Sequence, residues 1–87
     1  MTQEIQLTLI GKPGCHLCED AEVVVGEVLD EFAGKVALEK LNILEDEELF
    51  AKYSEEIPVL LINGKVHNYW RIDPDRLRSA IRDLLGR

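Results

Sequence analysis

Long hydrophobic runs and basic residues are both scarce in this chain of 87 residues. No stretch approaches the roughly 20 apolar residues that span a bilayer, which excludes a transmembrane helix. The first residues, MTQEIQLTLIGK, lack the basic start and long apolar core of a secretory signal, so we expect a cytoplasmic protein. Ten basic against seventeen acidic residues give a net charge of −7. This charge repels nucleic acids and anionic lipids, and we expect neither as a partner.

Cysteine is scarcer still, because the chain contains only Cys15 and Cys18. In a reducing cytoplasm such a pair is not expected to be a permanent disulfide staple. The length allows a single domain over residues 1–87, since half of the chain would be too small to stabilise a core of its own. We expect this domain to be a monomer.

The hydrophobic pattern predicts seven elements in the order strand, helix, strand, helix, strand, strand, helix. Strands are expected over 5–10 and 36–43, and helices over 17 to about 34, over 45–53 and from Asp73-Pro74 onward. The apolar run 59–62 predicts a strand at the sheet centre, and Asn63-Gly64 predicts a hairpin to a strand over 65–70. Gly26 interrupts the first helix, and we attribute it to a close approach to a strand. The fold class is therefore α/β, βαβαββα, with a mixed four-stranded sheet flanked by helices.

Cys15 and Cys18 lie between the first strand and the first helix, in the stretch GKPGCHLCED. Residues three positions apart in a first helical turn are close enough for a disulfide to open and close with little backbone motion. Unpaired N–H groups and the helix dipole at the helix start favour a thiolate on Cys15, which makes it the candidate nucleophile. Cys18, one turn further into the helix, is the candidate resolving cysteine. Lys12 and His16 are nearby cations that could further stabilise the Cys15 thiolate, and both are candidate substrate-binding residues, although either side chain could simply lie in solvent.

Two other interpretations of the cysteine pair remain open. A structural zinc site needs four ligands, of which the cysteines provide two, and the remaining histidine, His67, lies on a strand expected to be distant. The cysteines could also be two small core residues. Because the Gly-Lys-Pro-Gly turn and the helix start have no purpose in that case, we favour redox chemistry without a metal or a bound cofactor.

The segments KPGCHLC and EEIPVLLINGK, followed by a final helix, resemble the glutaredoxin-like branch of the thioredoxin superfamily. The resemblance implies that Cys15 attacks and Cys18 resolves. It also implies a cis peptide bond before Pro58 and a substrate strand paired with the backbone of Ile57. Four positions depart from the family pattern. Between the cysteines this chain has His16-Leu17 where glutaredoxins commonly have Pro-Tyr, and before Pro58 it has Glu56-Ile57 where Thr-Val is frequent. Trp70-Arg71 replaces the paired glycines of many glutaredoxins, and Leu9 stands where thioredoxins have a buried acid.

The hairpin geometry predicts that Arg71 returns to the cysteines, where it could receive a carboxylate of glutathione or of an acidic peptide beside the apolar wall of Trp70. Alternatively, Trp70 packs into the core and Arg71 pairs with Asp73 or Asp75. The predicted function is that of a thiol-disulfide oxidoreductase that reduces protein disulfides or glutathione mixed disulfides, with glutathione as a candidate co-substrate. The alternatives are a non-catalytic binding or adaptor module and an iron-sulfur cluster carrier.

Overall fold

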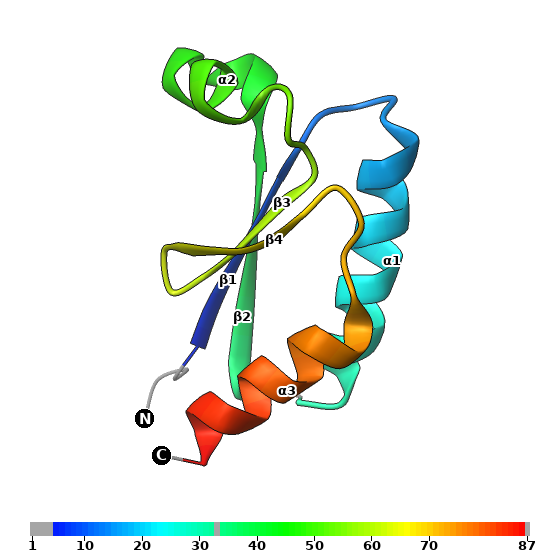
Figure 1. The fold of residues 1–87 in the computed structure, drawn as a ribbon, viewed down its shortest axis with the longest axis vertical. Coiled ribbons are helices and arrows are strands. Elements are labelled where there is room, and N and C mark those ends of the chain that lie inside the picture. The colour runs from blue at the N-terminus through cyan, green and yellow to red at the C-terminus, as the bar shows by residue number, and fades with distance from the viewer. Residues whose placement is uncertain (1–4, 33, 87) are drawn as a thin grey trace.

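The computed structural model describes residues 5–32 and 34–86 and has the predicted α/β order of elements (Figure 1). The strands are β1 (Ile5–Gly11), β2 (Val36–Asn42), β3 (Val59–Ile62) and β4 (Lys65–Tyr69). The helices are α1 (His16–Asp30), α2 (Glu47–Tyr53) and α3 (Pro74–Leu85). A short 3-10 turn that the sequence pattern did not predict, η1 (Ile43–Glu45), joins β2 to α2.

The four strands form one mixed sheet in the order β2-β1-β3-β4. β1 runs parallel to β2 and antiparallel to β3, and β4 runs antiparallel to β3. As predicted, β3 lies inside the sheet between β1 and β4, and its apolar run is buried on both faces, with Leu60 and Ile62 in one core and Val59 in the other. The pairing of β3 with β4 places Val59, at the start of β3, opposite Tyr69 at the end of β4.

Helices α1 and α3 pack together on one face of the sheet and bury the larger core (Figure 1). Arg78 on α3 forms two ion pairs. Its Nε lies 2.7 Å from Oε2 of Glu31, just after α1, and its Nη1 lies 2.9 Å from Oδ1 of Asp75. The buried members of this core are Ile5, Leu7, Leu9, Ala21, Val25, Val28, Leu60, Ile62, Ile72, Leu77 and Ile81. This packing holds α1 against the sheet through Ala21, Val25 and Val28.

The opposite face carries a smaller core beneath α2 and η1, formed by Ile10, Ile43, Tyr53 and Val59. In Figure 1, α2 covers only one end of the sheet, the end at which α1 begins. Leu9 belongs to the larger core and Ile10 to the smaller one, so both cores include residues near the end of β1, just before the connection to α1. None of the helices in the described part of the chain has the length and hydrophobicity that a bilayer crossing requires.

The Asn63-Gly64 hairpin is confirmed, and both residues adopt the positive φ angles, 51° and 85°, of the tight turn that this pair favours. Asn63 also ties the turn to β1, since its Oδ1 accepts the backbone N–H of Gln6 at 2.9 Å. Asp73 caps α3 as predicted, and its Oδ1 accepts the N–H groups of Asp75 and Arg76 at 2.9 and 3.2 Å.

Two details of the first helix differ from the sequence-based prediction. The helix ends at Asp30 rather than near residue 34, because the N–H of Glu31 turns back to bond the carbonyls of Val28 and Leu29. Gly26 does not approach a strand, since a Cβ atom at this position would meet nothing within 4 Å. The interpretation of Gly26 as a close-packing residue is therefore wrong.

Candidate active site

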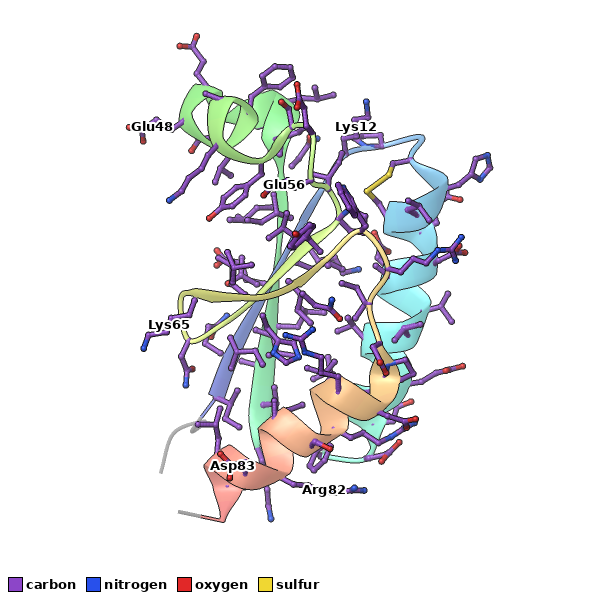
Figure 2. All side chains as sticks on the ribbon, in the orientation of Figure 1. Lys12, Glu48, Glu56, Lys65, Arg82 and Asp83 are labelled. Carbon is purple, nitrogen blue, oxygen red and sulfur yellow. A yellow bond between two sulfur atoms is a disulfide. The ribbon has the colours of Figure 1, made fainter. Side chains whose placement is uncertain are left out.

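Cys15 and Cys18 are joined by a disulfide at the start of α1, with their Cα atoms 5.2 Å apart. Figure 2 shows this bond in yellow at the end of the molecule where Lys12 and Glu56 are labelled. Cys15 is the N-cap of the helix, and its Sγ accepts the backbone N–H of Cys18 at 3.2 Å. Helix caps are normally oxygen atoms, so here a sulfur atom takes the place of the usual capping group.

The two cysteines differ in exposure as the sequence predicted. Cys15 is partly exposed to solvent, whereas Cys18 is only 5% exposed. Gly11, at the end of β1, permits this burial, because a Cβ atom there would stand 3.0 Å from Cys18 Sγ and 3.2 Å from its Cβ. The strand and the helix thus approach each other at the inner sulfur atom.

A cleft of about 540 Å³ reaches Cys18 from the side of β2 and α2. Its rim carries Lys12, which forms no ion pair with any described residue, and the ion pair between Glu22 and Lys40, with Nζ–Oε1 at 3.5 Å. Glu22 lies one helical turn beyond Cys18 on the same side of α1. The cleft therefore combines an apolar wall, which includes Leu9, Leu41 and Leu49, with a few charged groups.

His16 points into solvent beside the cysteine pair. Its side chain is 98% exposed, and Nδ1 lies 3.8 Å from Oε1 of Glu19. The ring thus extends toward Glu19 on the outer surface of α1. Lys12 lines the cleft that contains Cys18, but His16 does not line it.

The peptide bond between Ile57 and Pro58 is cis, as the family resemblance implied. Pro58 is buried and leads into β3, while Ile57 is partly buried against the smaller core. No hydrogen bond to the backbone of Ile57 occurs among residues 5–32 and 34–86. Its N–H and C=O groups are therefore available to an extended chain, in the way that a free strand edge is.

The residues after β4 return to the start of α1, as the hairpin predicted. The N–H of Trp70 donates to the carbonyl of Pro58 at 2.9 Å. A smaller cleft of about 120 Å³ follows, with Trp70 and Arg71 on one side and α1 residues on the other, namely Leu17, Asp20, Ala21 and Val24. Arg71 thus lies beside the helix turn that carries the cysteines.

The alternative placement of these two residues is wrong. Trp70 is 52% exposed instead of packing into the core, and Arg71 forms no ion pair with any described residue. The two expected partners have other roles, because Asp73 caps α3 and Asp75 pairs with Arg78. Within the described residues, no group of three or more His, Cys, Asp and Glu side chains could hold a metal ion.

Sequence analysis missed three features of this site. Gly11 appeared only as the first residue of the turn before the cysteines, although a glycine next to a strand can also indicate a close approach, here to Cys18. The Glu22–Lys40 pair joins residues 18 positions apart and leaves no local pattern. Trp70 has a φ of 65°, which nothing in its neighbourhood predicts, since bulky residues rarely adopt the left-handed region.

A family model described as the glutaredoxin-like domain (DUF836) matches residues 6–82, which include both cysteines and the cis-proline. The chain belongs to this glutaredoxin-like family. The family assignment and the βαβαββα sheet agree with the resemblance found in the sequence.

Similar proteins extend the comparison beyond the family model. A probable thioredoxin of Methanothermobacter thermautotrophicus is 31% identical, with 91% of this glutaredoxin-like chain and 94% of that protein covered. The X-ray structure of protein XcR50 from X. campestris is 31% identical, with a TM-score of 0.71 and coverage of 88% and 96%. Chloroplastic thioredoxin z shares only 13% identity but superposes with a TM-score of 0.80 over 98% of this chain and 81% of its own. That likeness shows the thioredoxin-like fold alone.

Proposed function

We propose that this protein is a thiol-disulfide oxidoreductase in which Cys15 attacks a substrate disulfide and Cys18 resolves the product. The observation that carries the proposal is the capping contact, in which Cys15 Sγ accepts the Cys18 N–H at the start of α1. In the reduced protein, the same N–H group and the helix dipole stabilise a thiolate on Cys15, and a thiolate is the attacking species. The membership of the glutaredoxin-like family and the similarity to a probable thioredoxin support this chemistry.

The reaction has two exchange steps that balance in sulfur and electrons. The Cys15 thiolate attacks a disulfide R–S–S–R′, forms Cys15–S–S–R and releases R′–S⁻, which takes up a proton. Cys18 then loses its proton and attacks Cys15 Sγ, which releases R–S⁻ and leaves the Cys15–Cys18 disulfide. Two electrons pass to the substrate, and a thiol donor in a reducing compartment restores the dithiol.

Alkylation of the reduced protein with iodoacetamide at pH 6 tests the roles of the two cysteines. Cys15 is expected to react first, because it is partly exposed and its thiolate is stabilised, whereas Cys18 is 5% exposed. Peptide mapping by mass spectrometry measures both rates, and the protein unfolded in guanidinium chloride serves as the control. Equal rates in the folded protein, or faster labelling of Cys18, would contradict the assignment.

The Cys18→Ser variant tests the reaction itself. It should accumulate a mixed disulfide between Cys15 and the substrate, because the resolving thiolate is missing, and Cys15→Ser should accumulate none. If the parent protein holds peptides but exchanges no disulfide with a dithiol, the protein is a binding module and not an oxidoreductase. A coloured purified protein with sulfide-bound iron would instead favour the iron-sulfur carrier.

Substrate recognition is assigned in this proposal to the backbone of Ile57 beside Pro58, and to the side chain of Arg71. Arg71 borders the smaller cleft next to α1 and lacks an ion-pair partner among the described residues, so it can receive a carboxylate of glutathione or of an acidic peptide. Lys12 borders the larger cleft, whereas His16 points into solvent and lines neither cleft. Neither side chain takes part in the covalent exchange steps.

Arg71→Ala should raise the KM for glutathione mixed disulfides about tenfold, since a hydrogen-bonded charge contributes roughly 1.5–3 kcal/mol. Stability and Cys15 alkylation should change little. Lys65→Ala is the matched control, because it removes the same charge at the hairpin, away from the disulfide in Figure 2. An equal KM in Arg71→Ala and Lys65→Ala would show that the substrate is recognised through the Ile57 backbone without a carboxylate contact.

A further inference from the structure

Trp70 has an unusual combination of properties that the disulfide chemistry does not explain. It is the only tryptophan of the chain, it is 52% exposed, and its φ of 65° lies in the left-handed region. A bulky residue rarely adopts this conformation, which persists only where the surroundings determine it strongly. The contacts that Trp70 makes should therefore explain why it is held there.

Both N–H groups of Trp70 donate to the same short segment, residues 55–58, between α2 and β3. The backbone N–H bonds the carbonyl of Pro58 at 2.9 Å, and the indole Nε1–H bonds the carbonyl of Glu55 at 3.1 Å. These two acceptors flank Ile57, whose own backbone forms no hydrogen bond with the described residues. The left-handed φ occurs at the residue that makes both bonds, so we associate the strained conformation with this double contact.

The aromatic ring of Trp70 is also held from its other side. The Tyr69 ring contacts it edge-on, with centroids 4.9 Å apart and an interplanar angle of 71°. Beyond the indole, Arg71 and Ile72 continue the wall of the smaller cleft toward α1. Trp70 thus joins segment 55–58 on one side to the cleft beside the cysteines on the other.

We propose that Trp70 is a positioning residue, whose two hydrogen bonds hold segment 55–58 so that the Ile57 backbone receives an extended substrate next to Cys15. The inference rests on the proposed oxidoreductase function and adds the residue that holds the substrate-pairing backbone in place. Pairing to the backbone of Ile57 selects for peptide bonds on the substrate and for no particular side chain. Small disulfides without peptide bonds gain nothing from this arrangement.

Trp70→Phe is the informative variant, because it keeps an aromatic ring and removes the indole N–H. Tyr69→Phe is the matched control, which alters the neighbouring ring and leaves both Trp70 hydrogen bonds intact. Two readouts are needed. Amide hydrogen exchange at Glu56, whose N–H bonds Tyr53 O at 2.8 Å within the segment, reports how firmly the segment is held. Steady-state kinetics compare a hexapeptide linked through its cysteine to 2-mercaptoethanol with bis(2-hydroxyethyl) disulfide.

In Trp70→Phe, loss of one hydrogen bond should speed exchange at Glu56 about threefold to tenfold, with no change in the amides of α1 and α3. The KM for the peptide disulfide should rise by a similar factor at constant kcat, while both constants for the small disulfide stay within twofold of the parent. Tyr69→Phe should match the parent in every measurement. This split between substrates is what a merely structural role would not produce.

Three results would overturn the inference. Unchanged exchange at Glu56 would mean that the indole bond does not hold the segment. Faster exchange with an unchanged KM for the peptide would make Trp70 a structural residue only, and an equal loss with both substrates would indicate damage to the cysteine pair. If the parent protein itself reduces neither disulfide, the proposed oxidoreductase function fails, which is distinguishable from a parent that is active and a variant that is unaffected.

Discussion

Gly11 offers the most direct test of how Cys18 is held, because this glycine leaves room for the buried sulfur atom. An added Cβ atom would lie 3.0 Å from Cys18 Sγ and 3.2 Å from Cys18 Cβ, closer than ordinary van der Waals contact. Gly11 does not have a positive φ, so alanine fits the local backbone and only the contact with Cys18 is perturbed. Gly11→Ala therefore isolates a single packing contact at the candidate active site.

The cost should fall mainly on the oxidised protein. A sulfur atom bound in the disulfide cannot rotate away from the new methyl group, whereas the free Cys18 side chain can change its rotamer. Overpacking a core costs about 1–3 kcal/mol, and about 30 mV corresponds to 1.4 kcal/mol in a two-electron couple. The reduction potential of Gly11→Ala should therefore be about 20–60 mV less negative than that of the parent.

Equilibration with dithiothreitol buffers, followed by alkylation and mass spectrometry, measures the potential. Gly26→Ala is the matched control, because the same methyl group meets nothing within 4 Å there. It should leave the potential unchanged and raise the free energy of unfolding by up to about 1 kcal/mol, the helix propensity difference between glycine and alanine. An unchanged potential in Gly11→Ala, with stability like that of the parent, would refute the idea that strand β1 confines Cys18.

Two further predictions concern stability. Partial burial, followed by the nearby Arg76, lowers the pKa of His67 below its usual value, while Asp73 opposes the shift. As the pH falls, His67 is therefore protonated in the unfolded chain before it is protonated in the folded protein. The free energy of unfolding should decrease for this reason as the pH falls below about 6.5. Urea unfolding at pH 7.5 and 5.5 should show a smaller loss in His67→Leu, with exposed His16→Gln as the control, and an unchanged loss in His67→Leu would contradict this. Asp73→Ala removes the cap of α3 and should lower the free energy of unfolding by about 1 kcal/mol, unless solvent replaces its two hydrogen bonds without cost.

Local patterns in the sequence were sufficient for most of the fold. The Asn63-Gly64 turn and the Asp73-Pro74 cap depend on the conformations of adjacent residues, and both are confirmed. The apolar run of β3 predicted a central strand because only a strand covered on both faces tolerates it. These features depend on residues close in sequence or on burial alone.

The parts of the site that sequence analysis missed depend on contacts between distant segments. The bond from the Trp70 indole to Glu55 spans 15 residues, and the pair of Lys40 with Glu22 spans 18. Gly26 was misinterpreted for the same reason, because whether a strand approaches a helix glycine is a question of tertiary packing. The cysteine pair was predictable because both residues lie within one helical turn, so their spacing in the sequence already indicates that they are close in space.

In the proposed mechanism, the two clefts beside α1 give the two exchange steps separate surroundings. Leu17 and Ala21 border the smaller cleft with Arg71, whereas Cys18 borders the larger one with Lys12, so the two clefts meet different faces of the helix. A substrate held beside Arg71 concerns the first step, the attack of Cys15. The second step requires a thiolate on Cys18, and a cation at the rim of the larger cleft favours it.

Lys12→Ala should therefore slow the second step and leave substrate binding unchanged. The contribution of one exposed charge is modest, so we expect the release of R–S⁻ from a preformed Cys15 mixed disulfide to slow about twofold to fivefold at low salt. The difference should disappear in about 1 M salt, where the Debye length falls to roughly 3 Å. Stopped-flow measurement of thiol release follows this step, with Lys65→Ala as the control for net charge. A release rate in Lys12→Ala equal to that of Lys65→Ala would mean that Lys12 is a solvated loop residue without influence on Cys18.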